Sequence, residues 1–178
     1  MSSSECLTGC WVGHYLQRGQ ERPITADVVQ VGERLSGTMC DGHPDGECSL
    51  FEVALEAGLP PGADEQLEAK VREALPDDAA GPIRYISHLP SDSVLEGRCK
   101  GQVVSFLKTY RGTSFSGYKA GSQLLGVQME GHAVHYEGRL SPDGLVIEGR
   151  WWIDVDLANG MRRIEGLFSL RRRGQPVE

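Results

Sequence analysis

The chain has 178 residues, a formal net charge of −7 and 39% hydrophobic residues, which suits one domain with a core of its own. The acidic balance argues against nonspecific binding to nucleic acid or to an anionic membrane surface. No apolar run approaches the length of a membrane span, and the N-terminus lacks the apolar segment of a signal peptide.

The first forty residues predict three strands joined by tight turns. The expected strands cover 9–17, 24–31 and 34–40. Gly19 and Pro23 bracket the first turn, and Gly32-Glu33 forms the second, because glycine and proline favour turn geometry.

Residues 41–90 interrupt this rhythm and are too long for a structureless loop. Ser49-Leu50-Phe51-Glu52 fits a capping box that opens a short helix, which Gly58 would end. Residues 64–75 predict a second helix, stopped by Pro76, and 83–89 fit an extra strand. We expect this insertion to be partly helical and to cover one mouth of the fold.

The second half returns to short strands. The expected strands cover 93–99, 102–110, 134–140, 145–153 and 162–171. Ser141-Pro142-Asp143-Gly144 predicts a hairpin turn between the third and fourth of these. Residues 112–130 are rich in Gly and Ser and predict a long loop, within which 124–129 has a strand pattern.

A five-residue pattern, apolar–polar–Gly–x–apolar, recurs along the predicted strands. Its copies are Leu7-Thr8-Gly9-Cys10-Trp11, Leu35-Ser36-Gly37-Thr38-Met39, Leu95-Glu96-Gly97-Arg98-Cys99, Tyr136-Glu137-Gly138-Arg139-Leu140, Ile147-Glu148-Gly149-Arg150-Trp151 and Ile164-Glu165-Gly166-Leu167-Phe168. Spacing by two places the glycine and both apolar residues on one strand face. Glycines on a buried face allow the bends that close a sheet. We therefore predict a mainly β protein: an eight-stranded antiparallel up-and-down β-barrel with a partly helical insertion between strands three and four.

This strand pattern resembles the calycin-like barrels, the group of lipocalins, fatty-acid-binding proteins and avidins. The avidin-like segments are Leu7-Thr8-Gly9-Cys10-Trp11, Leu35-Ser36-Gly37-Thr38, Val94-Leu95-Glu96-Gly97-Arg98 and Tyr136-Glu137-Gly138-Arg139. The resemblance covers most of the barrel and implies its fold. It does not carry biotin binding, because Met39, Asp41 and Gly13 stand where avidins place polar biotin contacts.

The glycine-bearing faces predict a ligand site inside the barrel. The inward residues are Trp11, Tyr15, Met39, Phe106, Lys108, Tyr110, Tyr136, Trp151 and Phe168. They form either an aromatic cup with one ammonium group or a closed core from which Lys108 reaches the rim. We expect some cavity, since inward glycines leave volume unfilled. The leading hypothesis is a soluble protein that binds a small apolar or aromatic molecule in the barrel.

Two alternatives remain open. An isomerase or cyclase on the same barrel would use Lys108, Tyr110 and Tyr136 as candidates for acid–base catalysis. An interaction module would instead use the outer barrel face at Trp152, Val146 and Leu167, and a homo-oligomer is possible.

The cysteines and histidines give weaker signals. Cys40, His43 and Cys48 have a spacing that could hold zinc, with His88 as a conceivable fourth ligand. They lack a paired Cys-x2-Cys, so we assign no metal and expect no cofactor. The five cysteines are odd in number and irregularly spaced, which predicts reduced thiols in a cytoplasmic protein.

Overall fold

The computed structural model of the protein describes residues 6–17, 19–43, 45–157 and 160–174. The chain separates into two compact units. Unit 1 comprises Met1–Gly42, Ser91–Arg111 and Gly131–Glu178, and unit 2 comprises His43–Pro90 and Gly112–Glu130. Whether they act as the single domain expected from the chain length stays a prediction, as does the covering of a barrel mouth by the insertion.

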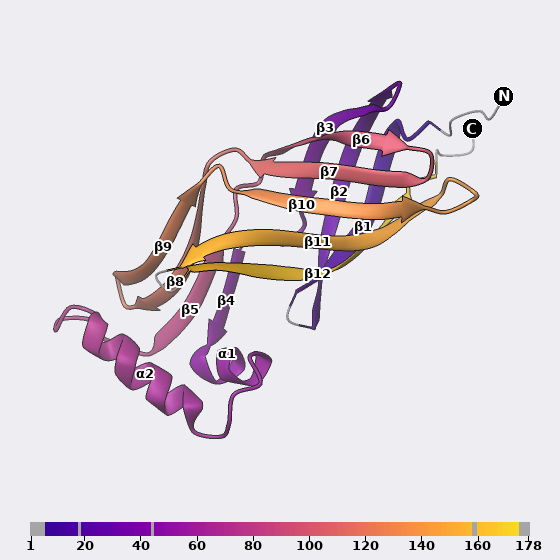
Figure 1. Cartoon of the computed structure of the whole chain (residues 1–178). Helices are drawn as coiled ribbons and strands as arrows, with labels where there is room; N and C mark the ends of the chain where they lie inside the picture. Colours follow the sequence, from indigo (N-terminus) through magenta and orange to yellow (C-terminus); the bar gives the residue numbers. More distant parts are fainter. Residues whose placement is uncertain (1–5, 18, 44, 158–159, 175–178) are drawn as a thin grey trace. The chain divides into compact units, whose positions relative to one another are not determined.

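Unit 1 is a closed antiparallel barrel of eight strands, which confirms the predicted fold class (Figure 1). Each strand pairs with the next barrel strand along the chain, and the last pairs with the first. The strands are β1 (Gly9–Gln17), β2 (Gln20–Val31), β3 (Arg34–Asp41), β6 (Ser93–Lys100), β7 (Val103–Tyr110), β10 (Ala133–Leu140), β11 (Val146–Leu157) and β12 (Gly160–Arg172).

The hairpin of β10 and β11 forms around the predicted turn. Its register places Gly138 opposite Gly149. The side chain of Ser141 accepts a hydrogen bond from the backbone N–H of Val146 at 2.9 Å, and the carboxylate of Asp143 accepts one from Leu145 at 3.1 Å. These bonds satisfy the backbone donors of the turn and fix the register of the hairpin.

Two of the inward glycines lie opposite aromatic residues of a neighbouring strand. Gly97 lies opposite Phe106 in the sheet, and Gly166 lies opposite Trp151. A Cβ atom added to Gly97 would lie 2.5 Å from Cβ of Phe106, and one added to Gly166 would lie 2.6 Å from Nε1 of Trp151. A side chain at either position would therefore collide with a neighbouring strand, so the glycines permit close packing there. The expected cavity inside the barrel stays a prediction.

One end of the barrel interior is apolar and closed by a cation. Trp11 is fully buried, and the guanidinium carbon of Arg172 lies 5.7 Å from the centre of its ring. Arg172 also donates hydrogen bonds to the carbonyl oxygens of Cys6 and Thr8 at 2.7 and 2.6 Å. The other residues of this end are Leu7, Val28, Leu35, Cys99, Val104, Leu140, Ile147 and Leu170, all of them buried.

Unit 2 is a four-stranded sheet with two helices. The strand order is β4 (Asp45–Ser49), β5 (Ile83–His88), β8 (Thr113–Ala120) and β9 (Gln123–Glu130). The helices are α1 (Leu50–Glu56), which the capping box of Ser49 and Glu52 opens as predicted, and α2 (Ala63–Ala74). Leu50, Val71, Leu75, Ile83 and Ala120 form its core.

Two expectations for these segments need correction. Residues 112–130 form the β8–β9 hairpin and not a long loop; the strand pattern at 124–129 is confirmed in β9, whereas β8 was not expected. The insertion 41–90 also contains β4, which was not expected, whereas the strand expected at 83–89 is confirmed as β5. The glycine-rich composition of 112–130 is typical of a loop. In the hairpin, however, Gly117 and Gly126 lie opposite each other, and the absence of side chains permits close backbone approach.

Candidate functional site

The other end of the barrel interior carries a cluster of polar side chains. Asp41 is the last residue of β3, and Lys108 and Tyr110 lie near the end of β7. Side chains two residues apart share a face of a strand, so Lys108 and Tyr110 project into the barrel together. The side chain of Lys108 is 0% exposed and that of Asp41 is 2% exposed.

The three side chains form a closed triangle of hydrogen bonds. Lys108 Nζ donates to Asp41 Oδ2 at 2.5 Å and to the Tyr110 hydroxyl at 2.8 Å. The Tyr110 hydroxyl in turn donates to the same Oδ2 atom at 2.8 Å. Both donors converge on one oxygen of the carboxylate.

The second carboxylate oxygen, Asp41 Oδ1, is buried and has no hydrogen-bond partner among the residues that the structure describes. An unsatisfied buried acceptor costs roughly 1–3 kcal/mol, and more when it carries charge. Buried polar groups in native proteins almost always have a partner, so this oxygen is a point where a further donor is expected.

Burial and the charge of Asp41 set the protonation of the surrounding groups. Burial lowers the pKa of Lys108, and the neighbouring Asp41 carboxylate opposes that shift. Burial raises the pKa of Tyr110, Tyr15 and Tyr136 above the ordinary value, and Asp41 raises each further. All three tyrosines therefore stay protonated and can donate hydrogen bonds at neutral pH.

His132 lies against the cluster, with its ring stacked on Tyr110 at a centroid distance of 4.4 Å. Burial lowers the pKa of His132, and the charge of Lys108 lowers it further, while Asp41 opposes them. Because the unfolded chain keeps the ordinary pKa near 6.5, it takes up a proton more readily than the folded protein as the pH falls below that value.

We therefore expect the melting temperature to fall as the pH drops from 7 to 5. Replacing His132 by Phe keeps an aromatic ring on Tyr110 and removes the titrating group, so this variant should lose less of its melting temperature over the same range. Thermal unfolding followed by circular dichroism at each pH measures the difference. An identical pH dependence in both proteins would assign the loss to other groups.

The aromatic side chains form a belt beside the polar cluster. The rings of Phe106 and Tyr136 stack at a centroid distance of 4.8 Å, and Phe168 meets Tyr136 edge-on at 5.1 Å. Tyr15 and Trp151 meet edge-on at 5.7 Å. All of the residues expected to point inward are buried: Trp11, Tyr15, Met39, Phe106, Lys108, Tyr110, Tyr136, Trp151 and Phe168. Their roles in binding stay predictions, as do the catalytic roles of Lys108, Tyr110 and Tyr136.

The structure divides these residues between the two ends of the barrel. Trp11 lies at the apolar end under Arg172, away from the cluster. The closed-core interpretation required Lys108 to reach the rim of the barrel. It does not, because its ion pair with Asp41 keeps the side chain inside.

Sequence reasoning missed Asp41, Ser93 and His132. Asp41 was assigned to the insertion, yet it follows Leu35, Gly37 and Met39 at spacing two, and that parity was the available signal. Ser93 is buried and donates a hydrogen bond to the carbonyl oxygen of Met39. No sequence signal placed His132 against Tyr110.

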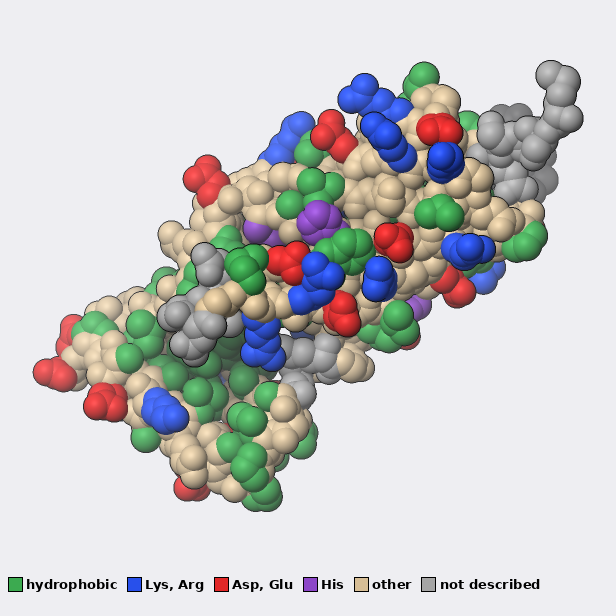
Figure 2. Space-filling model, viewed as in Figure 1, with side chains coloured by type: hydrophobic (Ala, Val, Ile, Leu, Met, Phe, Trp, Pro, Cys, Tyr) green, Lys and Arg blue, Asp and Glu red, His purple; other side chains and the backbone are tan. Residues whose placement is uncertain are grey.

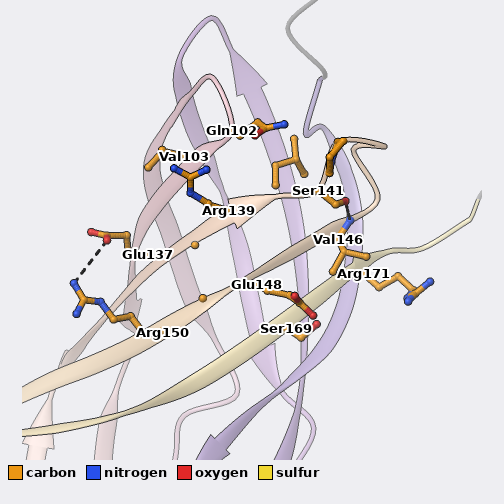
Figure 3. Close-up of a pocket in the computed structure, with 14 residues that line it drawn as sticks. Gln102, Val103, Glu137, Arg139, Ser141, Val146, Glu148, Arg150, Ser169 and Arg171 are labelled. Atoms are coloured by element: carbon orange, nitrogen blue, oxygen red, sulfur yellow. Dashed lines mark hydrogen bonds and ion pairs between the residues drawn. The ribbon is translucent and has the colours of Figure 1, made fainter.

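A broad open groove of about 1060 Å³ lies on the outer face of the barrel, over β10, β11 and β12 (Figure 3). Its charged lining consists of Glu137, Arg139, Glu148, Arg150 and Arg171. Glu137 and Arg150 pair across the strands at 3.7 Å, as expected for a cross-strand ladder. Figure 2 shows the same mixture of positive and negative side chains on the barrel face in view. Mixed charges at a shallow surface favour a solvated face over a binding site.

The contacts of Trp152 and the positions of the metal candidates bear on two further expectations. Trp152 stacks on His135 at 5.1 Å, and the guanidinium groups of Arg150 and Arg163 lie 5.3 and 5.5 Å from its ring centre. Of the described residues, no three His, Cys, Asp or Glu side chains are arranged to hold a metal ion, so Cys40, His43 and Cys48 gain no support as ligands.

Within the part of the chain that the structure describes, neither helix is long and apolar enough to cross a membrane. A cytoplasmic location stays a prediction.

Comparison with known proteins adds no relative to this geometry. A scan of protein-family models found no match, and the searches of curated proteins and of solved structures also found none.

Proposed function

We propose that the protein binds a small molecule at the polar end of the barrel interior. The ligand would have an apolar or aromatic body and would donate one N–H or O–H hydrogen bond to Asp41. The observation that carries this proposal is the buried Oδ1 atom of Asp41, to which no described residue donates a hydrogen bond of ordinary geometry. The Tyr15 hydroxyl also interacts with the Asp41 side chain, which raises the pKa of Tyr15, so this tyrosine would border the bound ligand.

The surrounding contacts support a ligand of this kind. Lys108 and Tyr110 already satisfy Oδ2 of Asp41, so a ligand that binds Oδ1 leaves the ion pair intact. Aromatic side chains lie beside the cluster, and ligand sites typically combine an apolar lining with a few polar groups. An eight-stranded barrel, the architecture of calycin-like proteins, is wide enough for one small ligand.

Matched probes test the proposal. Indole donates an N–H bond and 1-methylindole does not, and phenol and anisole differ in the same way. We expect indole and phenol to raise the melting temperature in a saturable manner, and their methylated partners to do so far less. At a ligand concentration 100 times Kd the stabilisation is about 2.7 kcal/mol.

The double variant Asp41→Asn/Lys108→Met is the control, because it removes both charges and leaves no unpaired ion. Its preference for indole over 1-methylindole should be reduced. A single ordered water on Oδ1 would also satisfy this atom. In that case none of the four probes would shift the melting temperature, and the proposal would be wrong.

The contact between Lys108 Nζ and the Tyr110 hydroxyl favours a second candidate, an isomerase or cyclase. A buried lysine beside a protonated tyrosine can move a proton to and from a bound carbonyl compound. Native mass spectrometry of the purified protein, followed by chemical identification of any retained molecule, separates the two functions. A binding protein returns the added molecule unchanged on incubation, whereas an enzyme converts it.

A further inference from the structure

The open sheet of unit 2 has two edge strands of different character. β4 is five residues long and carries Asp45 and Glu47, which are charges that discourage pairing with another strand. β9 is eight residues long, and its only charged residue, Glu130, stands at its end. The two edges therefore differ in how well they are protected.

β9 also exposes apolar side chains on both of its faces. Leu124 is 57% exposed and Val127 is 63% exposed. Their odd spacing places them on opposite faces of the strand. In the described part of the chain, β9 pairs with β8 alone, so its outer side presents a row of backbone N–H and C=O groups. Lys, Arg and Pro, which commonly protect such an edge, do not occur in its sequence.

We propose that β9 pairs antiparallel with β9 of a second copy of this chain, which joins two four-stranded sheets into one of eight strands. A two-fold axis normal to the sheet preserves its faces, so opposed residues must share a face. Centring the axis on Gly126 places Leu125 opposite Val127 and Leu124 opposite Gln128. In this register no charged side chain lies opposite another charged side chain, and Leu125 lies opposite the apolar Val127. A second copy of the chain is therefore a suitable partner for this edge.

Glu130 does not disturb this register. Its opposite position is Ser122, in the turn that precedes β9, so the two copies bring no carboxylates face to face. The contact is a single strand pair and is small beside standard interfaces, so we expect a weak dimer with a dissociation constant on the order of tens of micromolar.

Analytical ultracentrifugation of the full chain, from low micromolar to several hundred micromolar, tests the proposal. The molecular mass of the wild type should increase from that of a monomer to that of a dimer over this concentration range. Val127→Lys places a charge opposite Leu125 and should stay a monomer. Because Val127 is already 63% exposed, the replacement should leave the fold of the monomer intact, which circular dichroism checks.

Leu167→Lys is the matched control, since Leu167 is 61% exposed on β12 of the barrel. This variant should dimerise like the wild type. If it abolishes association and Val127→Lys does not, the interface is the outer barrel face and the proposal fails.

Hydrogen exchange locates the contact. Amides of residues 123–130 should gain protection with concentration in the wild type and not in Val127→Lys. A wild type that stays monomeric throughout, or a dimer without added protection in this segment, overturns the proposal.

Discussion

Replacing Lys108 by Met is expected to lower the free energy of unfolding by roughly 3–5 kcal/mol. The single replacement leaves the Asp41 carboxylate buried without its cation, since the Asp41 side chain is only 2% exposed. The Tyr110 hydroxyl would remain as its donor but carries no compensating charge. The double variant Asp41→Asn/Lys108→Met removes both charges and should recover most of the loss, because a neutral replacement of a buried ion pair is often tolerated.

Urea unfolding followed by circular dichroism measures all three proteins. The exposed ion pair of Arg163 and Asp154 provides the comparison, with side chains 52% and 37% exposed. Arg163→Met should cost far less than Lys108→Met, because solvent screens an exposed pair. If Lys108→Met were no more costly than Arg163→Met, the ion pair inside the barrel would not exist as described. A double variant as unstable as the single one would mean that shape, not charge, dominates this site.

The barrel could be predicted from sequence because its signal repeats. Each copy of the glycine pattern places an apolar residue, a glycine and a second apolar residue on one strand face. β1 matches its expected bounds, Gly9–Gln17, and the other barrel strands differ by a few residues at their ends. A register shift of one residue would exchange the inward and outward faces of a strand. Because the pattern gives the same inward face on several strands, their assignments support one another.

The polar cluster could be predicted only in part. Lys108 and Tyr110 lie on a strand whose parity was clear, and they were expected inside. Asp41 escapes the prediction because the expected strand ends at Cys40 and the expected insertion begins at residue 41, whereas β3 continues to Asp41. A buried carboxylate is rare enough that parity alone does not suggest it, and its cation comes from a residue far along the chain.

The sheet of unit 2 was harder to predict, since β8 lies far in sequence from β5, with which it pairs. Local patterns reveal hairpins but not pairings between distant segments. The strand pattern at 124–129 indicates β9, although its exposed Leu124 and Val127 break the alternation of buried and exposed residues, whereas the Gly- and Ser-rich segment of β8 predicts a loop.

Replacing Gly149 by Ala is expected to lower the free energy of unfolding by roughly 3 kcal/mol. A Cβ atom at this position would lie 2.0 Å from the carbonyl oxygen of Glu137 and 2.4 Å from Cα of Gly138. Both atoms belong to the backbone of β10, so no side-chain rotation relieves the clash. The strands would have to separate at the Gly138–Gly149 pair, where the two backbones approach closely.

Gly174→Ala is the control for this prediction, because no atom lies within 4 Å of a Cβ added at Gly174. It should change the free energy of unfolding by no more than about 0.5 kcal/mol in urea titrations. Gly149 also lies opposite Phe168, whose ring meets Tyr136 beside the polar cluster. The folded fraction of Gly149→Ala should therefore show a weaker preference for indole over 1-methylindole. Wild-type stability in this variant would mean that β10 and β11 do not approach so closely, and that this approach does not position the neighbouring aromatic rings.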